Sequence, residues 1–126
     1  MIRARESHAE VFVLQLRGVV STREFIARFS EVLGHETAQQ GFRILFDWRS
    51  LKQWRLDDWP VLSEGQRQVA ARRIERIALV HDVNWNRQAA MFAAVLRREN
   101  VLVRSWRPAQ IEGAAEWLRC RPLQWL

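Results

Sequence analysis

The side chains of this sequence that could do chemistry stand at the ends of two apolar runs. Asp47 follows one run, and His81 and Asp82 follow the other. A histidine beside two carboxylates is a set that proton transfer or metal binding can use. Ligands of open α/β sheets bind beyond the carboxyl ends of the strands, so we expect these three residues to line one rim, with Trp85 beside them.

A structural role competes with the catalytic one and is favoured. Aspartates after strands commonly accept hydrogen bonds from neighbouring loop amides. His8 and His35 fall elsewhere in the expected fold, and Cys120 has no evident histidine partner. The sequence has no Gly-x-Ser-x-Gly motif and no phosphate-binding glycine loop. We therefore predict no catalytic residues, no metal and no cofactor, and a protein that is not an enzyme.

Tryptophan is unusually frequent, with seven residues and no tyrosine. Trp48, Trp54, Trp59 and Trp85 lie beside polar residues in segments expected to be loops or helix starts. Residues 48–58 form the longest expected irregular segment, and such loops in compact domains are often functional. This segment and the turn at 82–85 are our candidate contact surface, which includes Arg49.

The positive net charge of the chain limits its possible binding partners only in part. The chain has 20 Lys+Arg against 14 Asp+Glu, and Lys52 is its single lysine. Arginine favours planar, bidentate contacts with carboxylate or phosphate groups. An acidic protein or an anionic membrane surface would fit, and arginine near loop tryptophans suits a membrane interface. The arginines are scattered along the chain, which argues against nucleic-acid binding. The basic charge is also compatible with a biased genome composition and an ordinary charged surface.

The elements that must position these side chains alternate between strand and helix. Three apolar runs without polar alternation, at 44–46, 77–80 and 101–103, predict parallel strands covered by helices. The expected strands are 2–6, 10–17, 42–47, one that begins at Ile74 or Arg76 and ends at 81–82, and 101–106.

Four helices are expected between and after these strands. The first begins with a capping box, in which Ser21 accepts from the amide of Glu24. The second begins at Asp57 or Asp58 and ends near residue 73, and the fourth begins at Pro108. The third follows Asn84, and its expected buried stripe is Met91, Phe92, Val95 and Leu96.

Length and composition indicate one domain over residues 1–126. No apolar run approaches the roughly 20 residues that span a bilayer. The first residues have no apolar region typical of a signal peptide, and one cysteine excludes an internal disulfide. These features predict a cytoplasmic protein.

The order and spacing of several residues resemble the SpoIIAA-like family of small bacterial proteins, which is related to STAS and SEC14-type domains. The resemblance covers about residues 9–120. The matching residues are Asp47 with Trp54 after it, Arg76 to Val80, Asp82, Trp85, Trp106, Ala114 and Trp117-Leu118.

This resemblance implies an α/β fold with a four- to five-stranded mixed sheet. The first two strands would form the only hairpin, and about four helices would pack largely on one side. STAS relatives act as anti-anti-sigma factors or as regulatory modules of transporters, and SEC14 relatives bind lipids. Residues 55–60 lack the phosphorylated serine of the anti-sigma antagonists, so no phosphorylation site is predicted. His81 also departs from the small residue common in the family.

Three functions follow as hypotheses. The leading one is a non-enzymatic regulatory or protein-interaction module with an unidentified protein partner. The alternative is a lipid or apolar small-molecule binding protein at the membrane surface. The third is a hydrolase or metal enzyme built on Asp47, His81 and Asp82. Exposed tryptophan and an apolar C-terminal tail are also compatible with a homodimer.

Overall fold

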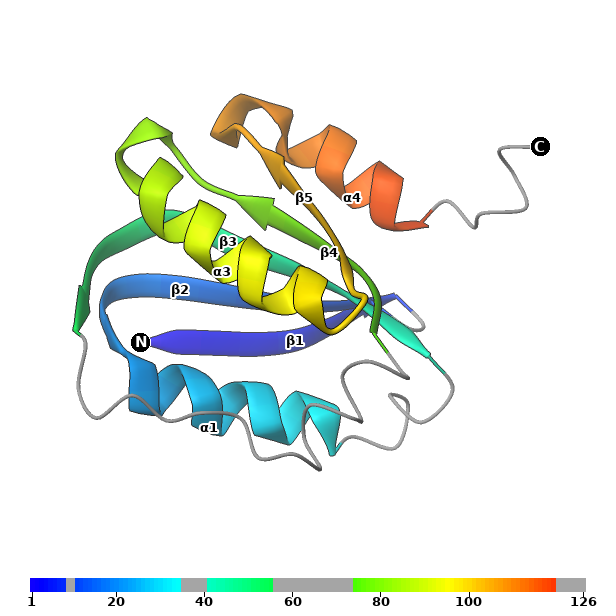
Figure 1. Cartoon of the computed structure of the whole chain (residues 1–126), viewed down its shortest axis with the longest axis horizontal. Helices are drawn as coiled ribbons and strands as arrows, with labels where there is room; N and C mark the ends of the chain where they lie inside the picture. The colour runs from blue at the N-terminus through cyan, green and yellow to red at the C-terminus, as the bar shows by residue number, and fades with distance from the viewer. Residues whose placement is uncertain (9–10, 35–40, 56–73, 120–126) are drawn as a thin grey trace.

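A computed structural model describes residues 1–8, 11–34, 41–55 and 74–119. Figure 1 shows the arrangement of these elements. The strands are β1 (Ile2–His8), β2 (Val11–Ser21), β3 (Phe42–Arg55), β4 (Ile74–Val80) and β5 (Leu102–Trp106). The α-helices are α1 (Thr22–Leu33), α3 (Asn86–Arg98) and α4 (Ile111–Arg119), with short 3-10 turns η2 (Val83–Trp85) and η3 (Pro108–Gln110). The helix expected near 58–73 lies outside the described residues.

The five strands form one mixed sheet in the order β1-β2-β3-β4-β5. β1 and β2 are antiparallel, and the other neighbours are parallel. This topology confirms the predicted fold class, including the N-terminal hairpin. Parallel neighbours need crossover connections, and the described helices α1, α3 and α4 follow β2, β4 and β5.

Both faces of the sheet are covered in the described structure (Figure 1). Alternate residues of β2 and β3, such as Leu14 and Phe46, join the larger core with α1 and α3. The intervening residues, such as Leu45, join a smaller core with α4. Of the three described helices, α4 thus lies on the face opposite to the other two. The Ser21 cap is confirmed, because its hydroxyl accepts from Glu24 N at 3.0 Å.

β3 is longer than the sequence predicted. The expected irregular segment is wrong for residues 48–55, which continue the strand to Arg55. The reason is a long neighbour: β2 extends to Ser21, which pairs with Arg55. Register shifts between Gln15 and Arg17 and after Gly18 absorb the mismatch between the two strands. Polar residues within this extension therefore concealed a strand.

The third helix is rotated relative to its predicted buried stripe. Met91 and Val95 are more than half exposed, so this part of the prediction is wrong. The buried residues are Ala89, Ala93 and Leu96, with Phe92 packed against the core. Small alanines let the helix axis approach the sheet closely, which decides between the two apolar stripes.

Two buried arginines hold the end of α4. Arg43 and Arg76 are register partners on β3 and β4. Arg76 Nη1 donates to the carbonyl of Trp117 at 2.7 Å, and Arg43 Nη1 donates to the carbonyl of Leu118. Cations at a helix C-terminus satisfy its free carbonyls and complement the helix dipole. The two strands therefore fix α4 through charge as well as apolar packing.

Candidate functional site

A cluster of tryptophans forms where β3 continues past Asp47. Trp48 is 1% exposed, and its ring lies 5.6 Å from that of Trp54 and 6.2 Å from that of Trp85. Trp54 and Trp85 are partly buried, and both pack against the larger core. The structure therefore brings together three of the four tryptophans singled out in the sequence. Trp59 lies outside the described residues.

The three indoles differ in their hydrogen bonds. Trp54 Nε1 donates to Thr22 Oγ1 at 2.8 Å, which ties the end of β3 to the first residue of α1. Trp48 Nε1 is buried and has no acceptor among the residues that the structure describes. Trp48 thus acts as the buried support beneath the two partly exposed rings, and its predicted loop position is corrected to a strand.

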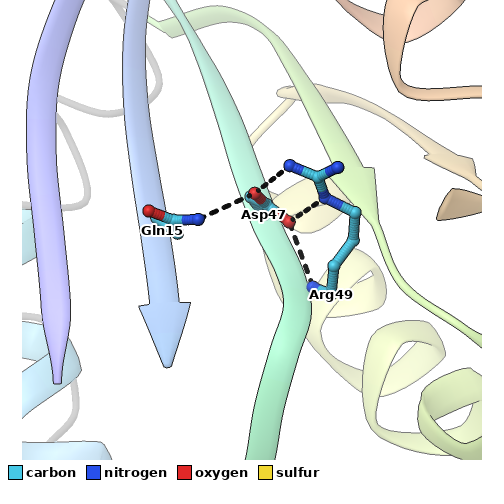
Figure 2. A network of polar contacts seen from close by, with 3 residues as sticks. All are labelled: Gln15, Asp47 and Arg49. Carbon is cyan, nitrogen blue, oxygen red and sulfur yellow. Dashed lines mark hydrogen bonds and ion pairs between the residues drawn. The ribbon is translucent and has the colours of Figure 1, made fainter. Parts of the chain in front are cut away.

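Asp47 lies on the opposite face of the sheet, where it is buried and held by two neighbours (Figure 2). Arg49 donates to its carboxylate from Nε and Nη2, both at 2.9 Å, and from the backbone amide at 3.0 Å. Gln15 Nε2 lies 3.5 Å from Oδ2. The hydrogen bond to Asp47 raises the pKa of Arg49, although burial opposes this. The carboxylate is therefore occupied by structural contacts.

Replacing Arg49 with glutamine is expected to lower the free energy of unfolding by about 1 kcal/mol. The effect is modest because the Arg49 side chain is 43% exposed and water screens the ion pair. Urea denaturation measures it, and Lys52→Gln, also on an exposed part of β3, is the control. A neutral Arg49→Gln would mean that Asp47 does not depend on this guanidinium.

His81 and Asp47 do not share a rim. Asp47 pairs with Val80, which belongs to the smaller core, so the next residue, His81, faces the other side. There the His81 ring lies 6.4 Å from Trp48. His81 Nδ1 is 2.8 Å from the carbonyl of Asp82, and because a carbonyl only accepts, Nδ1 carries the proton. The sheet thus separates the two groups that a catalytic set would need.

The turn after His81 is built by Asp82. Its carboxylate accepts from Asn84 N at 2.9 Å and caps η2, which continues into α3. The sequence placed the start of this helical segment after Asn84, but the structure starts it two residues earlier, with Asp82 as the cap of η2. Val83, at the tip of this turn, is 60% exposed, and Trp85 follows it on the core side. We call Trp54, Val83 and Trp85, resting on Trp48, the tryptophan rim.

The family model of the SpoIIAA-like proteins matches residues 11–119, which include all of these elements except β1. This chain belongs to the SpoIIAA-like family. Among curated proteins none matches it. The SpoIIAA-like sheet, with its antiparallel first pair and parallel remainder, agrees with the resemblance seen in the sequence.

Three further properties of this SpoIIAA-like domain concern metal binding, membrane spanning and cavities. Within the described ranges no three His, Cys, Asp or Glu residues gather closely enough to hold a metal ion. No helix in the same ranges is long and apolar enough to cross a membrane. A cavity of about 400 Å³ does lie between α3 and β5, and sequence analysis missed it.

Proposed function

We propose that this SpoIIAA-like domain is a non-enzymatic regulatory module that binds an acidic protein partner through the tryptophan rim. The observation that carries the proposal is an exposed apolar side chain, Val83, beside tryptophans that pack on the core. Val83 is 60% exposed at a turn, and it stands next to the half-buried Trp85. Apolar groups exposed beside tryptophan are typical of protein interfaces, where tryptophan often contributes much of the binding energy.

Charge beside the rim supports an acidic partner. Lys52 and Arg55 are exposed on the same extension of β3 that carries Trp54. The whole chain has a formal net charge of +6. Opposite charge on a partner would speed its approach and select it against basic competitors. An apolar contact at Val83 with acidic groups around it is the surface that fits best.

The polar groups near the rim support binding rather than catalysis. Asp47 is occupied by Arg49 on the far face of the sheet, and Asp82 caps η2. His81 has its Nδ1 proton committed to a backbone carbonyl. Each of these side chains stabilises a local turn or strand end, and this is the role that the sequence analysis favoured. A module that binds needs no further chemistry from them.

Replacing Val83 with aspartate is expected to weaken partner binding by tenfold or more, about 1.4 kcal/mol. The added carboxylate places a charge in the centre of the contact and repels an acidic partner. Immobilised wild-type and variant chains would be compared for the protein that each retains from a lysate of the source cells.

Leu102→Asp is the matched control for this substitution. Leu102 is 52% exposed and lies at the start of β5, whereas the rim lies beyond the end of β4. Circular dichroism would establish that both variants fold. Equal retention of the same protein by wild type and Val83→Asp would refute the rim as the contact surface.

A further inference from the structure

Helix α3 is apolar on its outer side as well as on the side that faces the sheet. Its middle, residues 89–96, consists of apolar residues only. Ala89 and Ala93 are buried against the core. Met91 and Val95 lie on the other side of the helix and are 58% and 52% exposed. A helix that is apolar all round is usually covered all round, so the outer side of α3 is a candidate contact surface.

An arginine stands at each end of this outer side. Arg87 and Arg98 are exposed. Met91 and Val95 lie between them at helical spacing, so that all four residues share one side of α3. At a rise of about 1.5 Å per residue, the two arginines are about 16 Å apart along the helix axis. We call these four residues the α3 seam.

The charges within α3 are all positive. The helix contains three arginines and no acidic residue. Glu99 follows the helix and offsets one of these charges, and Asp82 before it is the cap of η2. In the described part of the chain, neither Arg87 nor Arg98 forms an ion pair with an acidic side chain. Carboxylates of a partner are therefore the groups that complement the seam.

Other occupants complement the seam less well. Two copies of α3 packed side by side would place arginine against arginine at both ends, whether the helices run parallel or antiparallel. Helices that lie in a membrane interface usually insert tryptophan, phenylalanine or leucine, and the seam has none of these. Methionine is flexible and adapts to the side chains of a partner, and the small Ala94 beside it lets another helix approach closely.

We propose that the α3 seam binds an amphipathic helix of the acidic partner, with a carboxylate at each end of that helix's apolar face. The carboxylates contact Arg87 and Arg98, and the apolar face packs on Met91 and Val95. The partner's helix then carries two acidic residues about eleven positions apart, with apolar residues between them at helical spacing. The inference rests on the proposed function, because η2 leads directly into α3 and one partner can contact both the tryptophan rim and the seam.

A synthetic helical peptide tests the seam without the partner. The peptide has leucine and alanine on one face and two glutamates at the separation of Arg87 and Arg98. A second peptide has lysine in place of both glutamates. Fluorescence anisotropy at low ionic strength is expected to show that wild type binds the glutamate peptide more tightly. The double variant Arg87→Glu/Arg98→Glu should bind that peptide at least tenfold more weakly, a loss of about 1.4 kcal/mol, and should prefer the lysine peptide.

Arg3→Glu/Arg104→Glu is the matched control, because it changes the net charge equally at exposed residues of β1 and β5. Circular dichroism would establish that both double variants fold. The control should still prefer the glutamate peptide. Loss of the preference in both double variants would overturn the proposal, because net charge alone would then explain it. No binding by wild type, or equal binding of the two peptides, would overturn it as well.

Benzoylphenylalanine at position 91 separates this inference from the proposed function. With the partner that wild type retains, we expect crosslinks from positions 83 and 91, the latter to a segment with the acidic spacing. A crosslink from position 83 alone would keep the tryptophan rim and overturn the seam. A crosslink to that segment from position 91 alone would keep the seam and refute the rim. A crosslink from position 91 to a lipid or to the same chain would overturn the seam.

Discussion

Replacing Trp48 with alanine is expected to lower the free energy of unfolding by about 3–5 kcal/mol. Trp48 is the largest of the fully buried side chains in the described structure. It contacts Trp54, Trp85 and Phe92, whose ring centroid lies 5.6 Å from its own. Removing the indole leaves a cavity under the tryptophan rim, because the strand, η2 and α3 are all held elsewhere and cannot collapse into it.

Urea denaturation of wild type, Trp48→Ala and Trp48→Phe would measure this effect. Phenylalanine retains an aromatic ring and removes an indole N–H that has no acceptor among the described residues. Trp48→Phe should therefore cost less than about 1.5 kcal/mol. A loss of under 1 kcal/mol for Trp48→Ala, about the size of an average substitution, would contradict its role as the support of the rim.

Replacing Arg43 with alanine is expected to cost about 2–3 kcal/mol. The Arg43 side chain is buried and donates to the carbonyl of Leu118 and to Glu75, 3.1 Å away. The carbonyl at the end of α4 would lose its charged donor, and the helix would lose a dipole contact. The Glu75 side chain is 44% exposed, so its carboxylate would be hydrated in the variant and would add little to the loss of stability.

The shift in the urea midpoint measures this loss, with Arg87→Ala as the control. Arg87 is exposed on α3, and its removal should change stability by no more than about 0.5 kcal/mol. Arg43→Lys should retain part of the stability, because an ammonium keeps the charge but not the two-sided geometry of the guanidinium. Equal stability of Arg43→Ala and Arg87→Ala would show that α4 is held by apolar packing alone.

The fold was predictable because its signals are local and periodic. The apolar runs at 44–46 and 77–80 indicated buried strands, and the Ser21 cap marked the start of α1. The last helix was expected from Pro108, where the structure begins η3 and continues it as α4. In each case one stretch of sequence contained both the apolar pattern and the residue that ends it. Packing against neighbouring elements therefore did not change the predicted structure.

The errors arose where a distant element decides the outcome. Trp48 and Trp54 are separated by five residues of which three are charged or amide-bearing, and this pattern indicates a loop. Pairing with the long β2 makes it a strand. Likewise, packing against the sheet decides which side of α3 is buried. Ala89 and Ala93 are buried there, and Met91 is exposed.

The sequence indicated which residues of the candidate site lie near one another, but not the directions in which their side chains point. Proximity of Trp48 and Trp85 followed from their positions after adjacent parallel strands. The opposite orientation of Asp47 and His81 needed the register of β3 against β4, because one residue changes the face. The cavity beside α3 could not be found in sequence, because its lining residues come together only through the packing of α3 on β5.

Site-specific photocrosslinking at position 83 tests the central claim most directly. Benzoylphenylalanine would replace Val83 in one chain and Leu102 in another, and each would be irradiated with the partner that wild type retains. The tryptophan rim predicts a crosslinked partner from position 83 and none from position 102. A crosslink from position 102 alone would show that the partner binds at the opposite end of the strands and that the rim is a structural cluster only.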